Sequence, residues 1–206
     1  MRNTVHLKAA SINIDDSVLV EQSQSGDTAA MERLILKYQG RIYNVVLKMC
    51  ANADDAAELT QETFVKVIES IEKFKGRSSF YTWLFRIAVN LTLNYCQRNA
   101  RRATCSLDAE DTEPGGRSQQ VLKDFLSDAG AADPAAVAQD RELCDLAMQA
   151  LLRLDEPQRA VMVLRDIEGM DYAQIADVLN IELGTVRSRL SRARSHLREI
   201  LEAMLK

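Results

Sequence analysis

The residues Asp171–Arg198 constrain the fold most strongly, because their pattern predicts two helices joined by a tight turn. Three apolar residues of the first helix recur at helical spacing, and we expect them to face inward: Ile175, Ala176 and Leu179. A turn is predicted over Asn180–Gly184, and a second helix from Thr185 to the end of the chain. Helices and a turn of these lengths, with a small residue available for a close helix crossing, are typical of a helix-turn-helix.

The second of these helices has two different faces. At about 100° per residue, its apolar residues fall on one side: Val186, Leu190, Ala193 and Leu197. Arginine and serine residues fall on the other side: Arg187, Ser188, Ser191, Arg192 and Ser195. The segment Gly184–Arg198 holds five arginines and no acidic residue, whereas a merely solubilising face usually mixes Glu with Lys. The pattern therefore predicts one face for a core and one for DNA phosphates and base edges.

The composition favours helices throughout. The chain has 206 residues, of which 47% are hydrophobic, and three prolines and eight glycines leave long helices with few interruptions. No alternating strand pattern is visible, so we expect an all-α protein of one or two domains. No apolar run approaches the roughly 18–20 residues of a membrane span. The first residues also lack the zones of a signal peptide, and we expect a cytoplasmic protein with no direct membrane insertion.

The net charge of −4 conceals a strong segregation of charge along the chain. The segment Lys73–Leu107 holds seven basic residues and no acidic one, whereas Asp108–Asp145 holds ten acidic and three basic residues. A mildly acidic protein can therefore present two basic surfaces to nucleic acid, one near Lys73–Leu107 and one on the C-terminal helix.

Residues 103–134 separate two predicted helical domains. They contain two of the three prolines and few large apolar side chains, with at most a short helix near Val121–Leu126. A structureless stretch of this length is unusual inside one compact domain, so we expect a flexible linker. The predicted parts are a leader over 1–14, an N-terminal domain over 15–102, the linker over 103–134 and a C-terminal domain over 135–206.

Capping and breaking residues predict where the helices begin and end. Asp27 can cap a helix that runs to about Cys50, and Ser78 or Ser79 can cap another that runs to about Arg102. Pro157 in Asp155-Glu156-Pro157 is typical of a first helical turn. The other expected helices cover residues 15–24, from 52–55 to about 74, from about 134 to 154, and onward to Gly169.

The basic segment Lys73–Arg102 also concentrates aromatic residues: Phe80, Tyr81, Trp83, Phe85 and Tyr95. Aromatic rings among cations suit single-stranded nucleic acid, because bases stack on the rings and cations follow the backbone. Asn90 and Asn94 lie four residues apart, and their amides can hydrogen-bond the edge of an unstacked base. The alternative is that Trp83, Phe85 and Ile87 only pack the core.

The segment Asp54–Phe74 predicts a helix with an apolar and an acidic side. Four residues form the expected inward stripe: Phe64, Val67, Ile68 and Ile71. Asp55, Glu58 and Glu62 form the outward stripe, with Gln61 at its edge. From the residues alone this is an ordinary solvated face.

No catalytic, metal-binding or cofactor-binding residue is expected. Cysteines are widely spaced without a Cys-x-x-Cys pair, which argues against a zinc cluster; whether any has a redox role stays open for Cys50, Cys96, Cys105 and Cys144. His196 lies among arginines and is expected on a helix surface. Neither a metal–carboxylate cluster nor a nucleophile with its base is visible.

Three ordered motifs carry a resemblance to a known family: DDAAELTQETFVKV, KFKGRSSFYTWLFRIAVN and GTVRSRLSRAR. The chain resembles the extracytoplasmic-function (ECF) sigma factors of the sigma-70 family over nearly all of residues 15–206 except the linker. The resemblance implies a non-enzymatic, two-domain, all-α protein that binds core RNA polymerase and directs it to promoters. Residues 15–102 would then be sigma region 2, and residues 135–206 sigma region 4.

The resemblance also implies residue roles. Core polymerase, through its β′ clamp helices, would meet Asp55, Glu58, Gln61 and Glu62, and the β flap is a further expected contact of the chain. The −10 promoter element would meet Arg77, Ser78, Ser79, Tyr81, Arg86, Asn90 and Asn94. The −35 element would meet Arg187, Ser188, Arg189, Ser191 and Arg192. Some relatives carry a bulky residue at the position of Ser191, so the base preference there is open.

The resemblance extends to the linker and to regulation. The acidic linker would thread toward the active-site channel of the polymerase. Because residues 1–14 are too short to cover both domains, we expect a separate anti-sigma factor to inhibit the protein.

Two other functions compete with this one. A stand-alone helix-turn-helix regulator explains Asp171–Arg198 but not the aromatic basic segment, and it would bind promoter duplex tightly without polymerase. An enzyme acting on nucleic acid needs a catalytic cluster that the sequence does not contain, and activity in a nuclease assay with added metal would support it.

Overall fold

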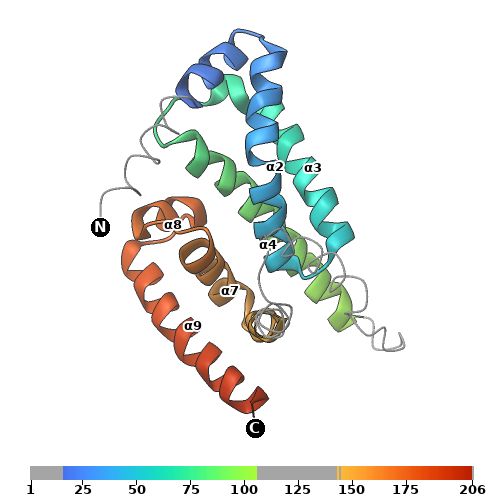
Figure 1. Ribbon diagram of the computed structural model, residues 1–206, viewed down its shortest axis with the longest axis vertical. Helices are drawn as coiled ribbons and strands as arrows, with labels where there is room; N and C mark the ends of the chain where they lie inside the picture. The colour runs from blue at the N-terminus through green and yellow to red at the C-terminus, as the bar shows by residue number, and fades with distance from the viewer. Residues whose placement is uncertain (1–15, 106–142, 144, 206) are drawn as a thin grey trace, which may run out of the picture.

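The computed structural model describes residues 16–105, 143 and 145–205, with the side chains of 102–105 left out. Within these ranges the ordered elements are all helices and no strand occurs, which confirms the predicted all-α class (Figure 1). The predicted leader, almost all of the linker, the short helix near Val121–Leu126 and the start of the C-terminal domain lie outside the described residues.

The N-terminal domain consists of a helix over residues 16–24, α2 (Thr28–Cys50), α3 (Ala53–Ser70), the short 3-10 helix η1 (Ile71–Lys73) and α4 (Phe80–Cys105). Asp27 caps α2 as expected, since its carboxylate accepts hydrogen bonds from the backbone N–H groups of Ala29 and Ala30. Asn52 caps α3 in the same way. The α4 helix continues three residues beyond the predicted end, into the segment assigned to the linker.

The core of the N-terminal domain lies between α2, α3 and α4, where Tyr38, Ile42, Phe64, Val67 and Phe85 are buried. The predicted stripe on α3 is confirmed with one exception. Ile68 is 51% exposed, because it lies about 100° around the helix from Val67, outside the arc that faces α2 and α4.

The C-terminal domain contains a helix over residues 145–152, α7 (Glu156–Met162), the π-helical turn η2 (Val163–Ile167), α8 (Tyr172–Leu179) and α9 (Leu183–Met204). Asp155 caps α7, with Pro157 in the first turn as predicted. Asp171 and Gln174 form a reciprocal capping box at the start of α8.

The helix-turn-helix differs in detail from its prediction. On α8 the buried residues are Ile175 and Val178, whereas Ala176 and Leu179 are half-buried. The turn is shorter than expected, because Asn180 adopts the left-handed conformation (φ 51°) that closes α8 within one residue. As a result α9 begins at Leu183, two residues before the predicted start.

The two domains pack against each other. In Figure 1, α7 and α8 (orange) lie beside α4 (green), and α8 contacts α4 most extensively across the boundary. The buried apolar side chains of both domains form one connected cluster. Nothing in the sequence pattern predicted this contact, which determines how much of each candidate binding surface is accessible.

Candidate nucleic-acid interface

The C-terminal helix α9 presents the two faces that its sequence predicts. Val186, Leu190 and Ala193 are buried against the other helices of the domain, and Leu197 is half-buried. Four of the five residues predicted to contact the −35 element are exposed and one, Arg189, is half-buried: Arg187, Ser188, Arg189, Ser191 and Arg192.

Hydrogen bonds on α9 show which arginine side chains are engaged. Arg192 donates from Nε to the carbonyl of Ser188 (3.3 Å) and from Nη2 to the Ser188 hydroxyl (3.5 Å), so it lies along the exposed face. Arg194 instead binds Asp166 of η2 at 2.7 Å, and this hydrogen bond and ion pair raise the pKa of Arg194. Arg194 therefore ties α9 to its own domain, whereas Arg192 faces solvent.

A basic pocket of about 240 Å³ lies where the η1–α4 loop meets the first turns of α4. Its lining is Lys73, Phe74, Lys75, Arg77, Ser78, Trp83 and Arg86. Four of these residues are cations and none is acidic, so the pocket suits a nucleotide, with phosphate charge at its rim and a base against the aromatic rings. The family resemblance implied Arg77, Ser78 and Arg86 for this site but not Lys73 or Lys75, although both belong to the same acid-free run.

The aromatic residues of this segment divide between core and pocket. Phe85 is buried, so the alternative that it only packs the core is correct for this residue, and Phe80 is buried as well. Trp83 does both, because its ring packs against Phe74 (centroids 5.0 Å apart) and Phe80 (5.8 Å) while it also lines the pocket. A ring fixed by neighbours on one side and open on the other is a suitable stacking platform.

Arg86, Asn90 and Asn94 follow one another at intervals of four residues and therefore share a face of α4. Asn90 and Asn94 are exposed. Arg86 lines the basic pocket, and Asn94 lines a second pocket of about 430 Å³ together with Glu62 of α3 and Arg98 of α4. Arg86, Asn90 and Asn94 thus form a strip along α4 that leads from the pocket toward α3.

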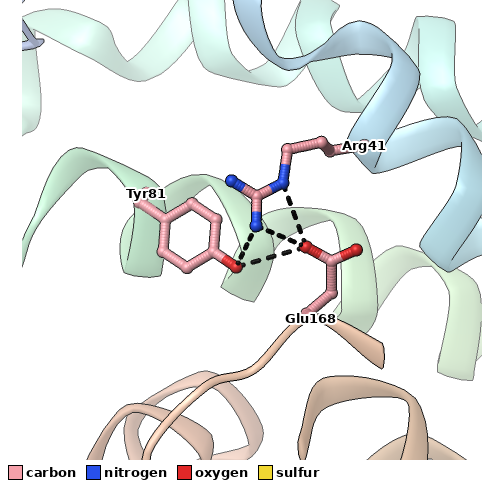
Figure 2. Close-up of polar contacts among 3 residues, drawn as sticks. All are labelled: Arg41, Tyr81 and Glu168. Atoms are coloured by element: carbon pink, nitrogen blue, oxygen red, sulfur yellow. Dashed lines mark hydrogen bonds and ion pairs between the residues drawn. The ribbon is translucent and has the colours of Figure 1, made fainter. Parts of the chain in front are cut away.

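Ser79 and Tyr81 are engaged differently from the other predicted −10 residues. The Ser79 hydroxyl caps α4, since it accepts a hydrogen bond from the Thr82 N–H at 3.1 Å and pairs with the Thr82 hydroxyl at 2.8 Å. Tyr81 is half-buried, and its hydroxyl contacts Arg41 of α2 and Glu168 of the C-terminal domain (Figure 2). Burial, reinforced by the nearby Glu168 carboxylate, raises the pKa of Tyr81.

The acidic side of α3 is a mixed surface rather than a purely solvated one. Glu58, Gln61 and Glu62 are exposed, and Val65 and Ile68, each 51% exposed, lie on the same side of the helix. Asp55 is half-buried and hydrogen-bonds Tyr95 of α4. Burial, and after it this hydrogen bond, raise the pKa of Tyr95. Exposed apolar residues among carboxylates are more typical of a protein-binding site than of a solubilising face. The helical angle of Ile68 would have revealed this from the sequence.

Neither metal nor thiol chemistry is indicated in the part of the chain that the structure describes. No group of three or more His, Cys, Asp or Glu side chains there is arranged to hold a metal ion. Cys50 and Cys96 are half-buried free thiols, and burial raises the pKa of Cys50 and raises that of Cys96 to about 11. The side chains of the other two cysteines, Cys105 and Cys144, are outside the part of the chain that the structure describes. Among the described helices, none has the length and apolar content to cross a bilayer.

Comparison with known proteins identifies the family to which these surfaces belong. Residues 34–102 match the family model for sigma-70 region 2, and residues 144–197 match that for sigma-70 region 4. The RNA polymerase sigma-H factor of Pseudomonas aeruginosa is 36% identical over 192 residues, which cover 93% of this chain and 96% of the relative. The chain belongs to the ECF sigma factors of the sigma-70 family. The ECF sigma-E factor of Escherichia coli K12 is 32% identical over 197 residues, 94% of this sigma factor and 97% of the relative.

Solved structures share the fold of this sigma factor. CnrH, in complex with the cytosolic domain of CnrY, gives a TM-score of 0.64 at 24% identity and covers 92% of this chain and 98% of its own. The sigma factor RpoE of Bartonella quintana, in complex with the anti-sigma factor NepR, gives 0.61 at 22% identity, covering 83% and 96%. The family-model matches over 34–102 and 144–197 confirm a region 2 domain and a region 4 domain. As a sigma factor, the protein directs RNA polymerase to promoters, which sets aside the stand-alone regulator.

Proposed function

We propose that this sigma factor divides promoter recognition between α4 and α9 and meets core polymerase through α3. The observation that carries the proposal is the acid-free pocket at the start of α4, which continues into the strip Arg86–Asn90–Asn94. Cations of the pocket would hold the phosphates of one separated strand, and the two asparagine amides would hydrogen-bond an unstacked base of the −10 element. Ser78 would join them at the rim, and Ser79 would act by fixing the start of α4.

On α9, the exposed face would enter the major groove at the −35 element. Arg187 and Arg192 would reach base edges or phosphates, with Ser188 and Ser191 beside them, and Arg189 at the flank would contact the backbone. Phosphate contacts position the helix and base contacts select the sequence. Binding by both surfaces should therefore weaken steeply as salt rises.

The mixed face of α3 would bind the β′ clamp helices of core polymerase, and the C-terminal domain would contact the β flap. Glu58, Gln61 and Glu62 would supply polar contacts, Val65 and Ile68 apolar ones, and Asp55 would support α3 through its bond to α4. The protein would act without catalysis of its own: capture of an unstacked base offsets part of a melting cost of a few kcal/mol, and the polymerase supplies the rest. Because core polymerase and promoter DNA are both cytoplasmic in bacteria, the protein would act in the cytoplasm.

We further propose that a separate anti-sigma factor controls this protein, by occluding the surfaces that bind polymerase. The solved structure of the sigma factor RpoE in complex with the anti-sigma factor NepR, which shares the fold of this chain, supports this proposal. Deletion of each neighbouring gene should raise transcription from the target promoters in at least one case. Strong transcription that no such deletion alters would contradict it.

In vitro transcription with core polymerase on a promoter library tests the assignment of the two DNA surfaces. Arg192→Ala should change which −35 sequences are selected, and Asn90→Ala should reduce initiation on all templates that share the −10 element. Arg153→Ala, an exposed arginine outside both surfaces, is the control and should behave as wild type. If neither substitution alters initiation, the assignment is wrong.

A further inference from the structure

Three side chains from three elements meet where the two domains touch. Arg41 of α2 donates from Nε (3.2 Å) and from Nη2 (2.9 Å) to one oxygen, Oε2, of Glu168, which follows η2 in the C-terminal domain. The Tyr81 hydroxyl of α4 donates to the same oxygen at 3.3 Å and accepts from Arg41 Nη2 at 3.2 Å. Figure 2 shows the three groups in a triangle of contacts, with Glu168 coming from the C-terminal domain and Arg41 and Tyr81 from the N-terminal domain.

Arg41 and Tyr81 form a pair without help from the other domain. The guanidinium carbon lies 4.9 Å from the centre of the Tyr81 ring, a cation–π contact within the N-terminal domain. The ring itself packs against Phe85, with centroids 4.4 Å apart. If the C-terminal domain moved away, Arg41 and Tyr81 would therefore keep their positions and would lose only the Glu168 carboxylate as their shared acceptor.

Glu168 is held in place by its own backbone. Its N–H donates to the carbonyl of Val163 at 3.0 Å, the i to i+5 hydrogen bond that ends the π-helical turn. The next residue, Gly169, turns the chain with a φ of +70°. The side chain of Glu168 is only 7% exposed, whereas that of Arg41 is 46% exposed. A buried carboxylate needs a paired cation, and within residues 16–105 and 145–205 the ion-pair partner of Glu168 is Arg41.

The surroundings of the carboxylate are basic. Besides Arg41, the half-buried Lys48 of α2 lies within its field: burial lowers the pKa of Lys48, and Glu168 opposes that effect. An anion that took the place of Glu168 would meet one guanidinium, one phenol hydroxyl and one further ammonium nearby. These are the groups that bind phosphate oxygens of nucleic acids.

We infer that Arg41 is a further promoter-binding residue, and that the Glu168 carboxylate occupies the position of a DNA backbone phosphate while the two domains are packed together. The inference rests on the proposed function, because Tyr81 beside it is assigned to the −10 element. When the domains separate, Arg41 and Tyr81 together bind a phosphate of the single strand whose base reaches the pocket and the asparagine strip. The free chain therefore hides part of its own DNA-binding surface.

Binding of single-stranded DNA to the full chain tests this inference. The probe is a fluorescein-labelled, random-sequence strand of about a dozen nucleotides, long enough to cover a strand-binding surface, and anisotropy gives its Kd at low salt. Random sequence suffices because a phosphate contact does not depend on the base. The four proteins of a double-mutant cycle are wild type, Arg41→Ala, Glu168→Gln and the double variant.

The effects of the Arg41 and Glu168 substitutions on Kd should depend on each other. Glu168→Gln should tighten binding about threefold or more while Arg41 is present, because the competitor loses its charge. In the Arg41→Ala background the same change should alter Kd by less than about 1.5-fold. Arg41→Ala made in the Glu168→Gln protein should weaken binding about fivefold, the loss expected for a phosphate contact at low salt.

Two further variants make the outcome unambiguous. Glu202→Gln removes the same charge from an exposed position of α9, so a gain that it reproduces would reflect net charge and overturn the inference. Equal effects of Glu168→Gln in both Arg41 backgrounds would overturn it too. Arg77→Ala, in the basic pocket, should weaken DNA binding in every background. If it does not, the proposed −10 surface is wrong. If Arg77→Ala weakens binding but Arg41 and Glu168 show no coupling, only the role of Arg41 is refuted.

Discussion

Arg159 is a half-buried cation that binds carbonyl groups in place of a carboxylate. It donates from Nη1 to the carbonyl of Met49 in the N-terminal domain at 2.6 Å, and from Nη2 to those of Leu152 and Leu154 at 2.7 and 2.9 Å. Its Nε is buried without a partner, and burial lowers the pKa of the guanidinium. One side chain therefore closes the turn before α7 and joins it to the end of α2.

Replacing this guanidinium should cost stability. We expect Arg159→Ala to lower the free energy of unfolding by about 2–3 kcal/mol, because the carbonyls that it satisfies lose charge-assisted hydrogen bonds. Urea unfolding followed by circular dichroism measures the change. Arg153→Ala, an exposed arginine six residues earlier, should stay within about 0.5 kcal/mol of wild type. Equal stability of the two variants would contradict the role of Arg159.

Cys96 should resist alkylation near neutral pH. Burial, chiefly, raises its pKa to about 11 from the usual 9.0, so the reactive thiolate reaches one half near pH 11 rather than pH 9. At pH 8 the rate with iodoacetamide should therefore be about a hundredfold below that of the unfolded chain. Mass spectrometry with and without urea gives both rates. A rate unchanged by urea would show an accessible thiol with an unshifted pKa and would contradict this prediction.

At the scale of helices, α9 separates its arginines by function. Arg192 lies along the exposed face, whereas Arg194, two positions later, is turned back to Asp166. The sequence predicted both faces of this helix, because a period of 3.6 residues distinguishes inward from outward positions. It could not show that Arg194 is tied to η2, since periodicity does not indicate which neighbour a charged side chain meets.

The difference between these arginines should appear in base preference. Arg192→Ala should reduce discrimination at one base pair of the −35 element by roughly tenfold, the value typical of a lost base contact. Arg194→Ala should leave the base preference unchanged, because its guanidinium is held by Asp166. Sequencing of promoters selected from a randomised −35 library with core polymerase measures both. A change of preference caused by Arg194→Ala alone would show that α9 docks on a different face.

Other elements mark where sequence reasoning succeeded and failed. The helix starts at Asp27 and Asp155, and the start within residues 52–55, were predictable because the side-chain hydrogen bonds that cap a helix are local. The left-handed residue Asn180 shortened the predicted turn, and the exposed Ile68 was assigned inward because α3 was given too wide an apolar arc. The basic and aromatic residues at the start of α4 predicted a nucleic-acid site there. The pocket itself could not be predicted, because its walls depend on the conformation of the loop between η1 and α4.

At the scale of the whole molecule, the two domains behave as one packed unit. The apolar cluster is continuous across the boundary, and Arg41–Glu168 and Arg159–Met49 add polar links. The sequence predicted two domains but not their contact, because Arg41 and Glu168 lie 127 residues apart and each reads as an ordinary surface charge. The packed arrangement holds α8 against α4, so the α4 and α9 surfaces are held in one fixed relation until the domains separate.

Unfolding should therefore be cooperative across the boundary. Trp83, the single tryptophan, reports on the N-terminal domain, whereas far-UV circular dichroism reports on helices of both domains. In urea the two transitions of the wild type should coincide, and Arg159→Ala should separate them by weakening the link. Transitions already separate in the wild type would show that the domain contact contributes little to stability.

The central claim is that α9 locates the promoter and α4 opens it, and permanganate reactivity of unpaired thymines tests it most directly. Core polymerase with wild-type sigma factor should render thymines of the −10 element reactive. Asn90→Ala should retain promoter binding but lose most of this reactivity, whereas Arg192→Ala should lose binding at the same promoter yet show normal reactivity in the complexes that form. Full reactivity with Asn90→Ala, or duplex complexes that form with Arg192→Ala but stay closed, would contradict the account.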